Sequence, residues 1–243
     1  MRIDVFTLFP EWFDWMRRPR HLANAAVTAN LEIRCFSYRD HTPLSAGQVD
    51  DAPYGGGPGM VLRVDVVAAA LEAVYGVAAE RVRETRRVAV LTPRGRLFTD
   101  AVARELASGG DLTLLAGRYE GFDERVHRAL ASDEICIGPY VLAGGEIPAM
   151  AIIDAVARRL PGALGNAASL DTESFSEALG GGTEHPHYTR PALFRGHAVP
   201  DVLLSGDHGA VARWRAAHGG PPPAGPGAPG AAGPDVSRPE CAG

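Results

Sequence analysis

Residues 111–160 read DLTLLAGRYE GFDERVHRAL ASDEICIGPY VLAGGEIPAM AIIDAVARRL. Two short apolar runs in this stretch, 111–116 and 134–138, are each followed by a glycine-containing loop and then by a segment with helical periodicity, 122–130 and 146–159. Short apolar runs beside glycine or proline are typical of buried strands, whereas apolar residues at intervals of three and four are typical of helices. The stretch therefore predicts two buried strands, each leading through a loop into a helix.

The same alternation extends over the first 160 residues of the chain. We expect further strands at 2–6, 31–37 and 87–91, and further helices at 10–18, 65–76 and 99–107. Regular alternation predicts an α/β fold with a parallel sheet covered on both faces. Ligands of such sheets bind beyond the carboxyl ends of the strands. The loops that open at Leu91, Gly117 and Ile137 fall at that edge, so we expect them to converge on one site.

The composition is that of an ordinary soluble globular protein, because 46% of the 243 residues are hydrophobic and 22% are charged. This is enough for one core and an appendage. The sequence contains no uncharged apolar run of about 18 residues and begins directly on the strand-like segment 2–6, so we expect no membrane span, no signal peptide and a cytoplasmic location. Cys35, Cys136 and Cys241 are too widely spaced for a disulfide framework or a zinc site. We expect reduced thiols, the first two in core strands.

The formal net charge of −5 argues against a generally cationic coat for nucleic acid, and leaves only a local basic patch open. All 24 basic residues are arginines. This usage is more typical of a GC-rich coding sequence than of RNA binding, although arginine is the better residue for bidentate contacts to phosphates and bases.

The pattern changes after residue 160. Residues 161–190 are small and polar with glycine runs, which predicts a mobile connector or lid. A small helical unit is expected at 191–218, with a helix over 210–217 and Asp207 as its cap. Residues 219–243 are rich in proline and glycine and cannot bury a core, so we predict a disordered tail.

A further glycine-rich segment, DAPYGGGPGM, occupies residues 51–60. The sequence has no G-x-x-x-x-G-K-[ST] motif, and G-x-G-x-x-G occurs only at residues 225–230, in the proline-rich tail and not between a strand and a helix. This disfavours phosphate binding of the Rossmann or P-loop kind. A single glycine loop is more often a simple turn than a binding site. However, Tyr54, Tyr119 and Tyr140 are interleaved with the glycines and offer hydrogen-bond donors and stacking faces. The loops together therefore favour one shared ligand site.

Two other polar groups have ordinary interpretations. His185 and His187 suggest a metal, but the proline between them and the lack of a nearby cysteine favour an ordered polar loop, and we predict no metal centre. Asp154 and Arg158 are four residues apart on one helix face, which is typical of an intrahelical ion pair. Such a pair would also hold the guanidinium in a fixed pose.

Four motifs in collinear order resemble the TrmD family of bacterial tRNA (guanine-N1-)-methyltransferases. They are residues 53–60, 117–126, 137–150 and 185–191, within a similarity that runs from Met1 to about Arg215. The resemblance implies a SPOUT-class α/β fold with a deep trefoil knot, here over residues 1–160, and a small tRNA-binding unit at 191–218. It also implies methylation of tRNA at N1 of the guanosine adjacent 3′ to the anticodon, with S-adenosylmethionine as cofactor. The family acts as an obligate homodimer whose sites are completed by the partner chain.

The resemblance further implies which residues form the cofactor pocket. Backbone groups should read the adenine, because glycine and proline provide few side chains. The matching positions are Leu91, Thr92, Pro93, Gly117, Tyr119, Glu120, Gly121, Ile137, Gly138, Tyr140, Leu142, Gly144 and Gly145.

Guanine N1 carries a proton, so methylation needs a base for that proton and a cation for the charge that develops on O6. Arg158 matches the family's catalytic arginine. The family's base is an aspartate in the connector, and Glu173 stands at that position with one more methylene, a change in reach that can cost orders of magnitude in rate. Asp171 is the alternative base. The family usually has an acidic residue at the position of Pro139, and this residue contacts magnesium or the substrate. The resemblance therefore makes Mg²⁺ a second candidate cofactor, although Pro139 would weaken the contact.

Three functional hypotheses follow. The first is the tRNA methyltransferase, the second a related enzyme repurposed for another RNA or a small nitrogen heterocycle, and the third a non-catalytic binding homologue. Arg118, Arg158 and residues 185–191 favour the first. Glu173, Pro139 and the proline-rich end, where the family continues into further helices that grip tRNA, favour the other two.

Overall fold

The computed structural model describes residues 1–165 and 173–222. Asp171 and Cys241 lie outside these ranges, as does the tail beyond residue 222. The chain divides into two compact units, Met1–Ala167 and Ala168–Gly243. Within the described ranges, no helix is long and apolar enough to cross a membrane.

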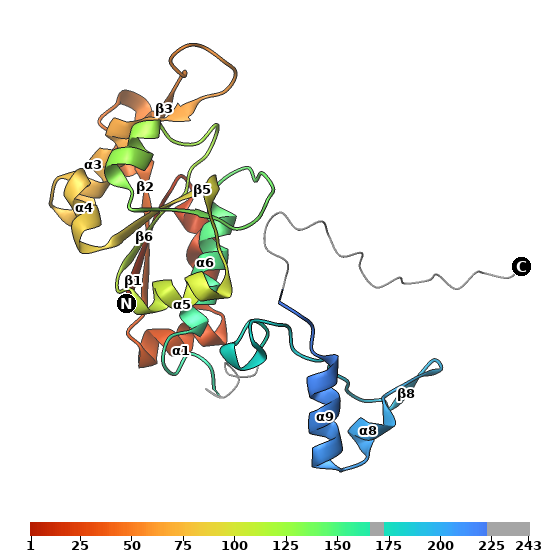
Figure 1. Cartoon of the computed structure of the whole chain (residues 1–243). Helices are drawn as coiled ribbons and strands as arrows, with labels where there is room; N and C mark the ends of the chain where they lie inside the picture. The colour runs from red at the N-terminus through yellow and green to blue at the C-terminus, as the bar shows by residue number, and fades with distance from the viewer. Residues whose placement is uncertain (166–172, 223–243) are drawn as a thin grey trace, which may run out of the picture. The chain divides into compact units, whose positions relative to one another are not determined.

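The first unit is built around a five-stranded sheet in the order β2-β1-β6-β5-β7 (Figure 1). Every neighbouring pair is parallel, which confirms the predicted α/β fold class. The strands are β1 (Arg2–Thr7), β2 (Glu32–Ser37), β5 (Arg87–Leu97), β6 (Leu112–Leu115) and β7 (Asp133–Cys136). All four residues of the central strand β6 are buried, since helices cover both faces of a parallel sheet.

Helices cover the sheet from two sides and bury a separate apolar cluster on each. One side carries η1 (Pro10–Arg17), α1 (Arg20–Thr28), α5 (Asp100–Ser108) and α6 (Glu146–Arg158). The other side carries α2 (Tyr38–His41), α3 (Val64–Tyr75), α4 (Ala79–Thr85) and the π-helical turn η3 (Val126–Leu130). Alternate residues of β6 face the two layers: Leu114 packs with the α6 side and Leu115 with the α3 side. The carboxyl edge of the sheet remains the place where loops can meet.

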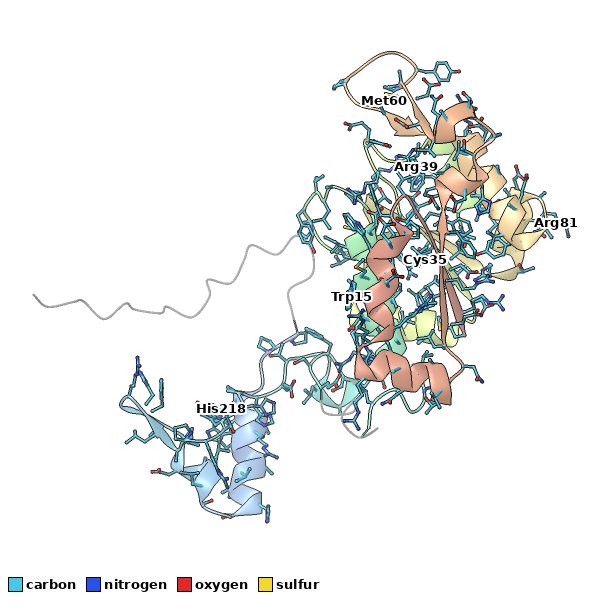
Figure 2. All side chains as sticks on the ribbon, turned by 180° about the vertical axis from the view of Figure 1, so that it is seen from behind. Trp15, Cys35, Arg39, Met60, Arg81 and His218 are labelled. Carbon is cyan, nitrogen blue, oxygen red and sulfur yellow. The ribbon has the colours of Figure 1, made fainter. Side chains whose placement is uncertain are left out.

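The first unit also contains short elements outside the five-stranded sheet. They are the turn η2 (Ser45–Gly47) and the antiparallel pair β3 (Asp50–Asp51) and β4 (Val61–Leu62). The loop between β3 and β4 projects from the unit, with Met60 near its return (Figure 2).

Several predicted elements differ from the structure. The segment predicted as one helix over 10–18 is the 3-10 helix η1, and the helices α1 and α4 were not predicted. The helix predicted over 122–130 begins two residues later: residues 124–130 are helical, the last five of them as the π-helical turn η3. Backbone pairing is the reason: Phe122 forms a bridge with Leu62, and the Asp123 N–H donates to the Leu62 carbonyl at 2.9 Å, so this backbone cannot enter a helix.

The two described cysteines lie on strands, as predicted, but neither is fully in the core. Cys35 on β2 and Cys136 on β7 are free and half-buried. Burial raises the pKa of the Cys35 thiol to about 12. Cys35 is therefore protonated and poorly nucleophilic at neutral pH.

The second unit consists of short elements. They are η4 (Glu177–Leu179), β8 (Leu193–Phe194), β9 (His197–Ala198), α8 (Asp201–Leu204) and α9 (His208–His218). The Asp207 carboxylate accepts from the Ala210 N–H at 2.9 Å, which confirms the predicted cap. Thr183 and Gly220 exchange two backbone hydrogen bonds, so ordered pairing continues past residue 219. None of the large apolar side chains in residues 173–222 is buried.

Candidate functional site

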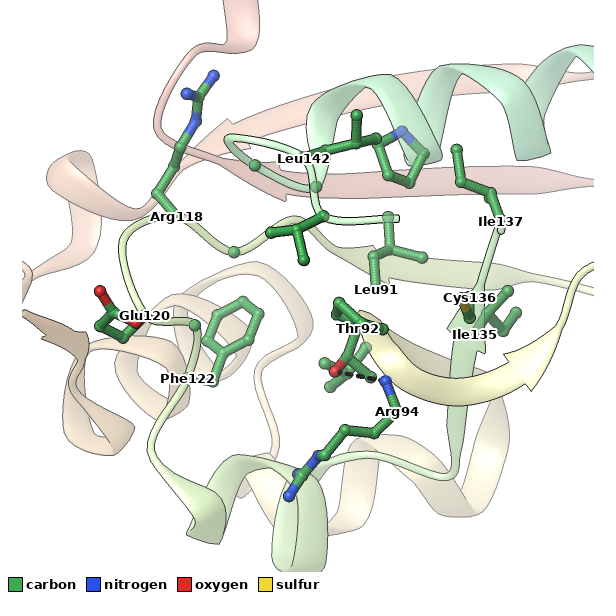
Figure 3. Close-up of a pocket in the computed structure, with 18 of the residues that line it drawn as sticks. Leu91, Thr92, Arg94, Arg118, Glu120, Phe122, Ile135, Cys136, Ile137 and Leu142 are labelled. Atoms are coloured by element: carbon green, nitrogen blue, oxygen red, sulfur yellow. Dashed lines mark hydrogen bonds between the residues drawn. The ribbon is translucent and has the colours of Figure 1, made fainter. Parts of the chain in front are cut away.

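One cavity of about 440 Å³ opens at the carboxyl edge of the sheet (Figure 3). Three segments enclose it: the middle of β5, the loop that follows β6, and the loop between β7 and α6. This is where the strand order predicts that ligands bind. Its volume lies within the usual range for small-molecule sites.

The first wall is an irregularity in a strand and not the separate loop that was predicted. Leu91 and Arg96 both pair with Ile135 of β7, so residues 92–95 leave the ladder between them. The strand resumes pairing because Gly95 packs directly on the β7 backbone, where a Cβ atom would overlap Glu134 and Ile135. The bulged residues are thereby turned toward the cavity.

The second and third walls are joined to each other through backbone. The Gly145 N–H donates to the Gly117 carbonyl at 2.8 Å, and Arg118 forms an antiparallel bridge with Gly144. A Cβ atom on Gly145 would lie 2.7 Å from the Ala116 Cα, which is closer than real Cβ contacts. The glycine at this position is therefore required by the approach of the two loops.

Every residue predicted for the cofactor pocket lines this one cavity. They are Leu91, Thr92, Pro93, Gly117, Tyr119, Glu120, Gly121, Ile137, Gly138, Tyr140, Leu142, Gly144 and Gly145. The lining also contains side chains that the prediction missed, among them Arg94, Phe122, His127 and Cys136. Figure 3 places Phe122 between Glu120 and Thr92. Its position depends on the bridge to Leu62, which no local pattern reveals.

Charged groups in and beside the lining form oppositely charged pairs. Arg118 Nε lies 3.0 Å from Glu146 Oε2, and Arg94 Nη2 lies 2.9 Å from Glu124 Oε2. Hydrogen bonds from Arg94 and then Arg128 lower the pKa of the Glu124 carboxyl. The buried Nδ1 of His127 lies 3.2 Å from the Glu134 carboxylate, and the two form an ion pair only when the imidazole is protonated. The cavity thus combines peptide groups and apolar surface with ionised groups that can meet a zwitterionic ligand.

The glycine-rich loop 52–60 does not belong to the cavity lining, contrary to the expectation of one site shared by all loops. Tyr54 is 99% exposed, so only Tyr119 and Tyr140 of the three tyrosines line the cavity. The end of the loop is nevertheless attached to the site, because the Glu120 N–H donates to the Met60 carbonyl at 3.0 Å.

Of the candidate catalytic residues, only Arg158 belongs to the first unit, and it is not among the residues that line this cavity. Arg158 is the last residue of α6, whose first residue, Glu146, lies beside the cavity. With 1.5 Å per residue, the helix separates these two positions by about 18 Å. Glu173 belongs to the second unit, and Asp171 lies outside the described residues.

Asp154, which the sequence pairs with Arg158, lies 2.8 Å from the imidazole Nε2 of His21 on α1. The Asp154 carboxylate therefore has a neighbouring basic side chain on another helix, besides the Arg158 that the sequence predicts as its partner.

The second unit contains a smaller pocket of about 310 Å³. Its lining includes His185, His187, Arg190 and Arg215. The rings of His185 and His187 are 4.7 Å apart, and His187 Nε2 lies 2.9 Å from the Glu184 carboxylate. Burial, followed by the neighbouring cations, lowers the pKa of His185. In the described ranges, no group of three histidine, cysteine or carboxylate side chains is placed to hold a metal ion.

Comparisons with known proteins agree over most of the chain. Residues 1–220 match the family model described as tRNA (guanine-1)-methyltransferase TrmD. A tRNA (guanine-N(1)-)-methyltransferase of Geobacter metallireducens is 50% identical over 215 residues, which are 88% of this chain and 84% of that protein. Proteins of the same name from Sorangium cellulosum and Heliobacterium modesticaldum are 48% and 47% identical, covering 89% and 88% of this chain and 88% and 78% of their own lengths.

Proposed function

The chain belongs to the tRNA (guanine-1)-methyltransferase TrmD family, and on this premise we propose that it methylates N1 of the guanosine adjacent 3′ to the anticodon in tRNA. It is a tRNA (guanine-N1-)-methyltransferase. The repurposed enzyme and the non-catalytic homologue are not favoured, because the match includes the first 220 residues and relatives from several bacteria.

The observation that carries the proposal is the single cavity lined by every predicted cofactor residue. We propose that S-adenosylmethionine binds there as the methyl donor. Peptide groups of the glycine loops suit an adenine ring, and the paired charges around Arg94 and Glu124 suit the amino-acid end. When bound, the donor supplies an electrophilic methyl group on its sulfonium sulfur.

We further propose that the loops around the cavity are threaded as a deep trefoil knot. Support comes from the close contact of the loop before α6 with the loop after β6, at Gly145 and Gly117 and at Arg118 and Gly144.

For the acid–base step we propose Glu173 as the base that takes the N1 proton of guanine, with Asp171 as the alternative. Methyl transfer forms the N1–C bond and breaks the S–C bond, while the N1 proton passes to the carboxylate. Arg158 stabilises the negative charge that develops on O6.

We propose a homodimer in which the partner copy supplies Arg158 to each cavity. The support is the distance of about 18 Å along α6 between Glu146 and Arg158, which one arginine side chain does not span. Exposed large apolar side chains add support. Two of them, Trp12 and Trp15, lie on η1, and Figure 2 labels the second. Two others, Val141 and Ile147, lie in the segment that borders the cavity. Light scattering checks this, and a fully active monomer would contradict it.

The second unit is proposed to bind tRNA through residues 191–218 together with the pocket beside them. Arg190 and Arg215 offer charge to phosphates, and Trp214 stacks with His218 at 4.1 Å between ring centroids. Aromatic rings and arginines are the usual means of holding unpaired nucleotides.

One assay tests the reaction. Purified protein is incubated with labelled S-adenosylmethionine and unmodified tRNA that carries guanosine 3′ to the anticodon, and the methyl group is then mapped. We expect label at N1 of that guanosine, and a chelator arm shows whether Mg²⁺ is a second cofactor. Label on another nucleotide would favour a repurposed substrate, and absence of label would overturn the proposal.

A further inference from the structure

Arg118 lies where the two glycine loops meet, and its guanidinium is held from several sides. Nε donates to Glu146 Oε2 at 3.0 Å, and Nη1 donates to the Ala143 carbonyl at 3.4 Å. The guanidinium carbon also lies 4.7 Å from the Phe9 ring centroid and 4.9 Å from that of Trp12. Only 17% of the side chain is exposed. In Figure 3 the guanidinium points away from the cavity.

Glu146 anchors the other side of this arrangement. Its side chain is 1% exposed, and its second oxygen accepts from the Thr7 hydroxyl at 2.8 Å. Glu146 is also the first residue of α6, where the helix dipole favours a negative charge. A buried charge of this kind needs its partner, because leaving one member of a buried pair uncompensated is strongly unfavourable.

Gly144 shows that the loops are built around this ion pair. A Cβ atom on Gly144 would overlap Arg118 Nε and the Glu146 carboxylate. The space left by the missing side chain is therefore filled by the protein's own ion pair. The sequence suggests that glycine at position 144 leaves room for the ligand, but in the structure it leaves room for the Arg118 side chain.

We infer that Arg118 is a positioning residue that assembles the donor cavity before any ligand is present. It acts through the loops 117–121 and 142–146, which it ties to each other, to η1 and to the end of β1. Preassembly spares the cost of ordering these loops on binding, so the effect of Arg118 falls on donor affinity and not on the rate of methyl transfer. The identity of the donor rests on the proposed function.

The test compares Arg118→Met with Arg125→Met. Arg125 is 64% exposed, pairs with Asp123 at 2.7 Å and is absent from the cavity lining, so it controls for the loss of an arginine on the same segment. Binding of S-adenosylmethionine is measured by calorimetry without RNA, and single-turnover methylation is measured at saturating donor.

We expect Arg118→Met to weaken donor binding by at least about tenfold, because donor binding must then also order the two loops, and fixing the backbone of even one residue costs about 1–2 kcal/mol. The rate at saturating donor should stay within about twofold of wild type, and the control should match wild type in both measurements. Unchanged donor affinity would overturn the inference. So would a large loss of rate at saturating donor, which would place Arg118 in the reaction itself.

Two further measurements keep the inference testable if Arg118→Met does not fold. Phe9→Leu removes one aromatic contact of the guanidinium and, unlike Trp12, Phe9 is not among the side chains assigned to the dimer contact. It should weaken donor binding by about threefold, the scale of a cation–π contact. Wild-type affinity in that variant would then count against the inference. Hydrogen exchange of the amides in 117–121 and 142–146 needs no ligand: faster exchange in Phe9→Leu supports assembly by Arg118 even if S-adenosylmethionine proves to be the wrong donor, and unchanged exchange counts against it.

Discussion

The two units of this chain bury their apolar side chains to different extents. In the first, apolar clusters on both faces of the sheet are buried almost completely, and the cavity opens at the carboxyl edge of that sheet. In the second, none of the described large apolar side chains is buried, and α9 has no buried residue. A small unit without a core leaves its side chains available to a partner but gains little stability of its own. We therefore expect the first unit to determine folding and donor binding, and the second to determine RNA binding.

The largest contrast should be in stability. Leu114→Ala removes a fully buried side chain of the central strand and should lower the free energy of unfolding by about 2–5 kcal/mol. Leu204→Ala in the second unit, where the side chain is 59% exposed, should change it by less than about 0.5 kcal/mol. Urea denaturation followed by circular dichroism checks both. Equal losses would mean that the second unit carries a core of its own.

The rate of methyl transfer should depend on a residue of the second unit, whereas donor binding should not. If Glu173 is the base, Glu173→Gln should slow single-turnover methylation by roughly a hundredfold or more, while donor binding stays unchanged. Asp171→Asn should be mild, and Glu173→Asp should reveal whether the longer carboxylate suits this substrate. A wild-type rate for Glu173→Gln together with an inactive Asp171→Asn would move the base by two residues.

Donor binding should depend on close packing within the first unit alone. Gly145→Ala places a methyl group against the Ala116 Cα and the Gly117 nitrogen, so the two loops must separate, and we expect donor affinity to fall by about tenfold, or about 1.4 kcal/mol. Gly165→Ala is the matched control, because nothing lies within 4 Å of its added methyl group. Calorimetry on both variants decides, and equal affinities would show that the loops tolerate separation.

RNA binding should be sensitive to charge in the second unit. Arg215→Ala removes one cation from the pocket beside α9 and should reduce the salt dependence of tRNA affinity by about one unit of slope in a plot of log K against log salt. Donor affinity should not change. An unchanged slope would exclude a phosphate contact at Arg215.

Surface ion pairs should matter least in either unit. Hydrogen bonds from Arg96 and then Arg87 lower the pKa of Glu105 to about 2, so its contribution to stability is fully present above the unfolded pKa of about 4.5 and disappears as pH falls toward 2. Because these side chains are partly exposed, the effect should be below about 1 kcal/mol.

The contribution of Glu105 to stability is checked by urea denaturation. The midpoints of Glu105→Gln and wild type are compared at neutral pH and in acid. The difference should shrink in acid, whereas Glu184→Gln in the second unit should show little difference at either pH. A difference for Glu105→Gln that grows in acid would contradict the sign of the pKa shift.

Local pattern was sufficient for the sheet and for the backbone of the cavity. Strands such as β6 are short apolar runs, and the glycines at 117, 144 and 145 mark loops at strand ends, so both features are visible within a few residues. The residues predicted to bind the cofactor are largely of this kind, and they line one cavity, whereas their binding of S-adenosylmethionine stays a prediction.

Long-range pairing was beyond the reach of local pattern. Thr7 and Glu146 are 139 positions apart in the chain, yet they share a hydrogen bond. Phe122 enters the cavity because its backbone pairs with Leu62, and Arg118 meets Trp12 only after the sheet has formed. The distance between Arg158 and the cavity likewise follows from the length of α6 and not from any motif.

The length of α6 has a genetic consequence. In the proposed dimer, the beginning of this helix belongs to one methylation site and its end to the other. When one copy has a defect near Gly145 and its partner has a defect at Arg158, both defects therefore fall in the same site, and the second site is intact. Two alleles that are inactive alone would then complement each other when they are expressed in the same cell.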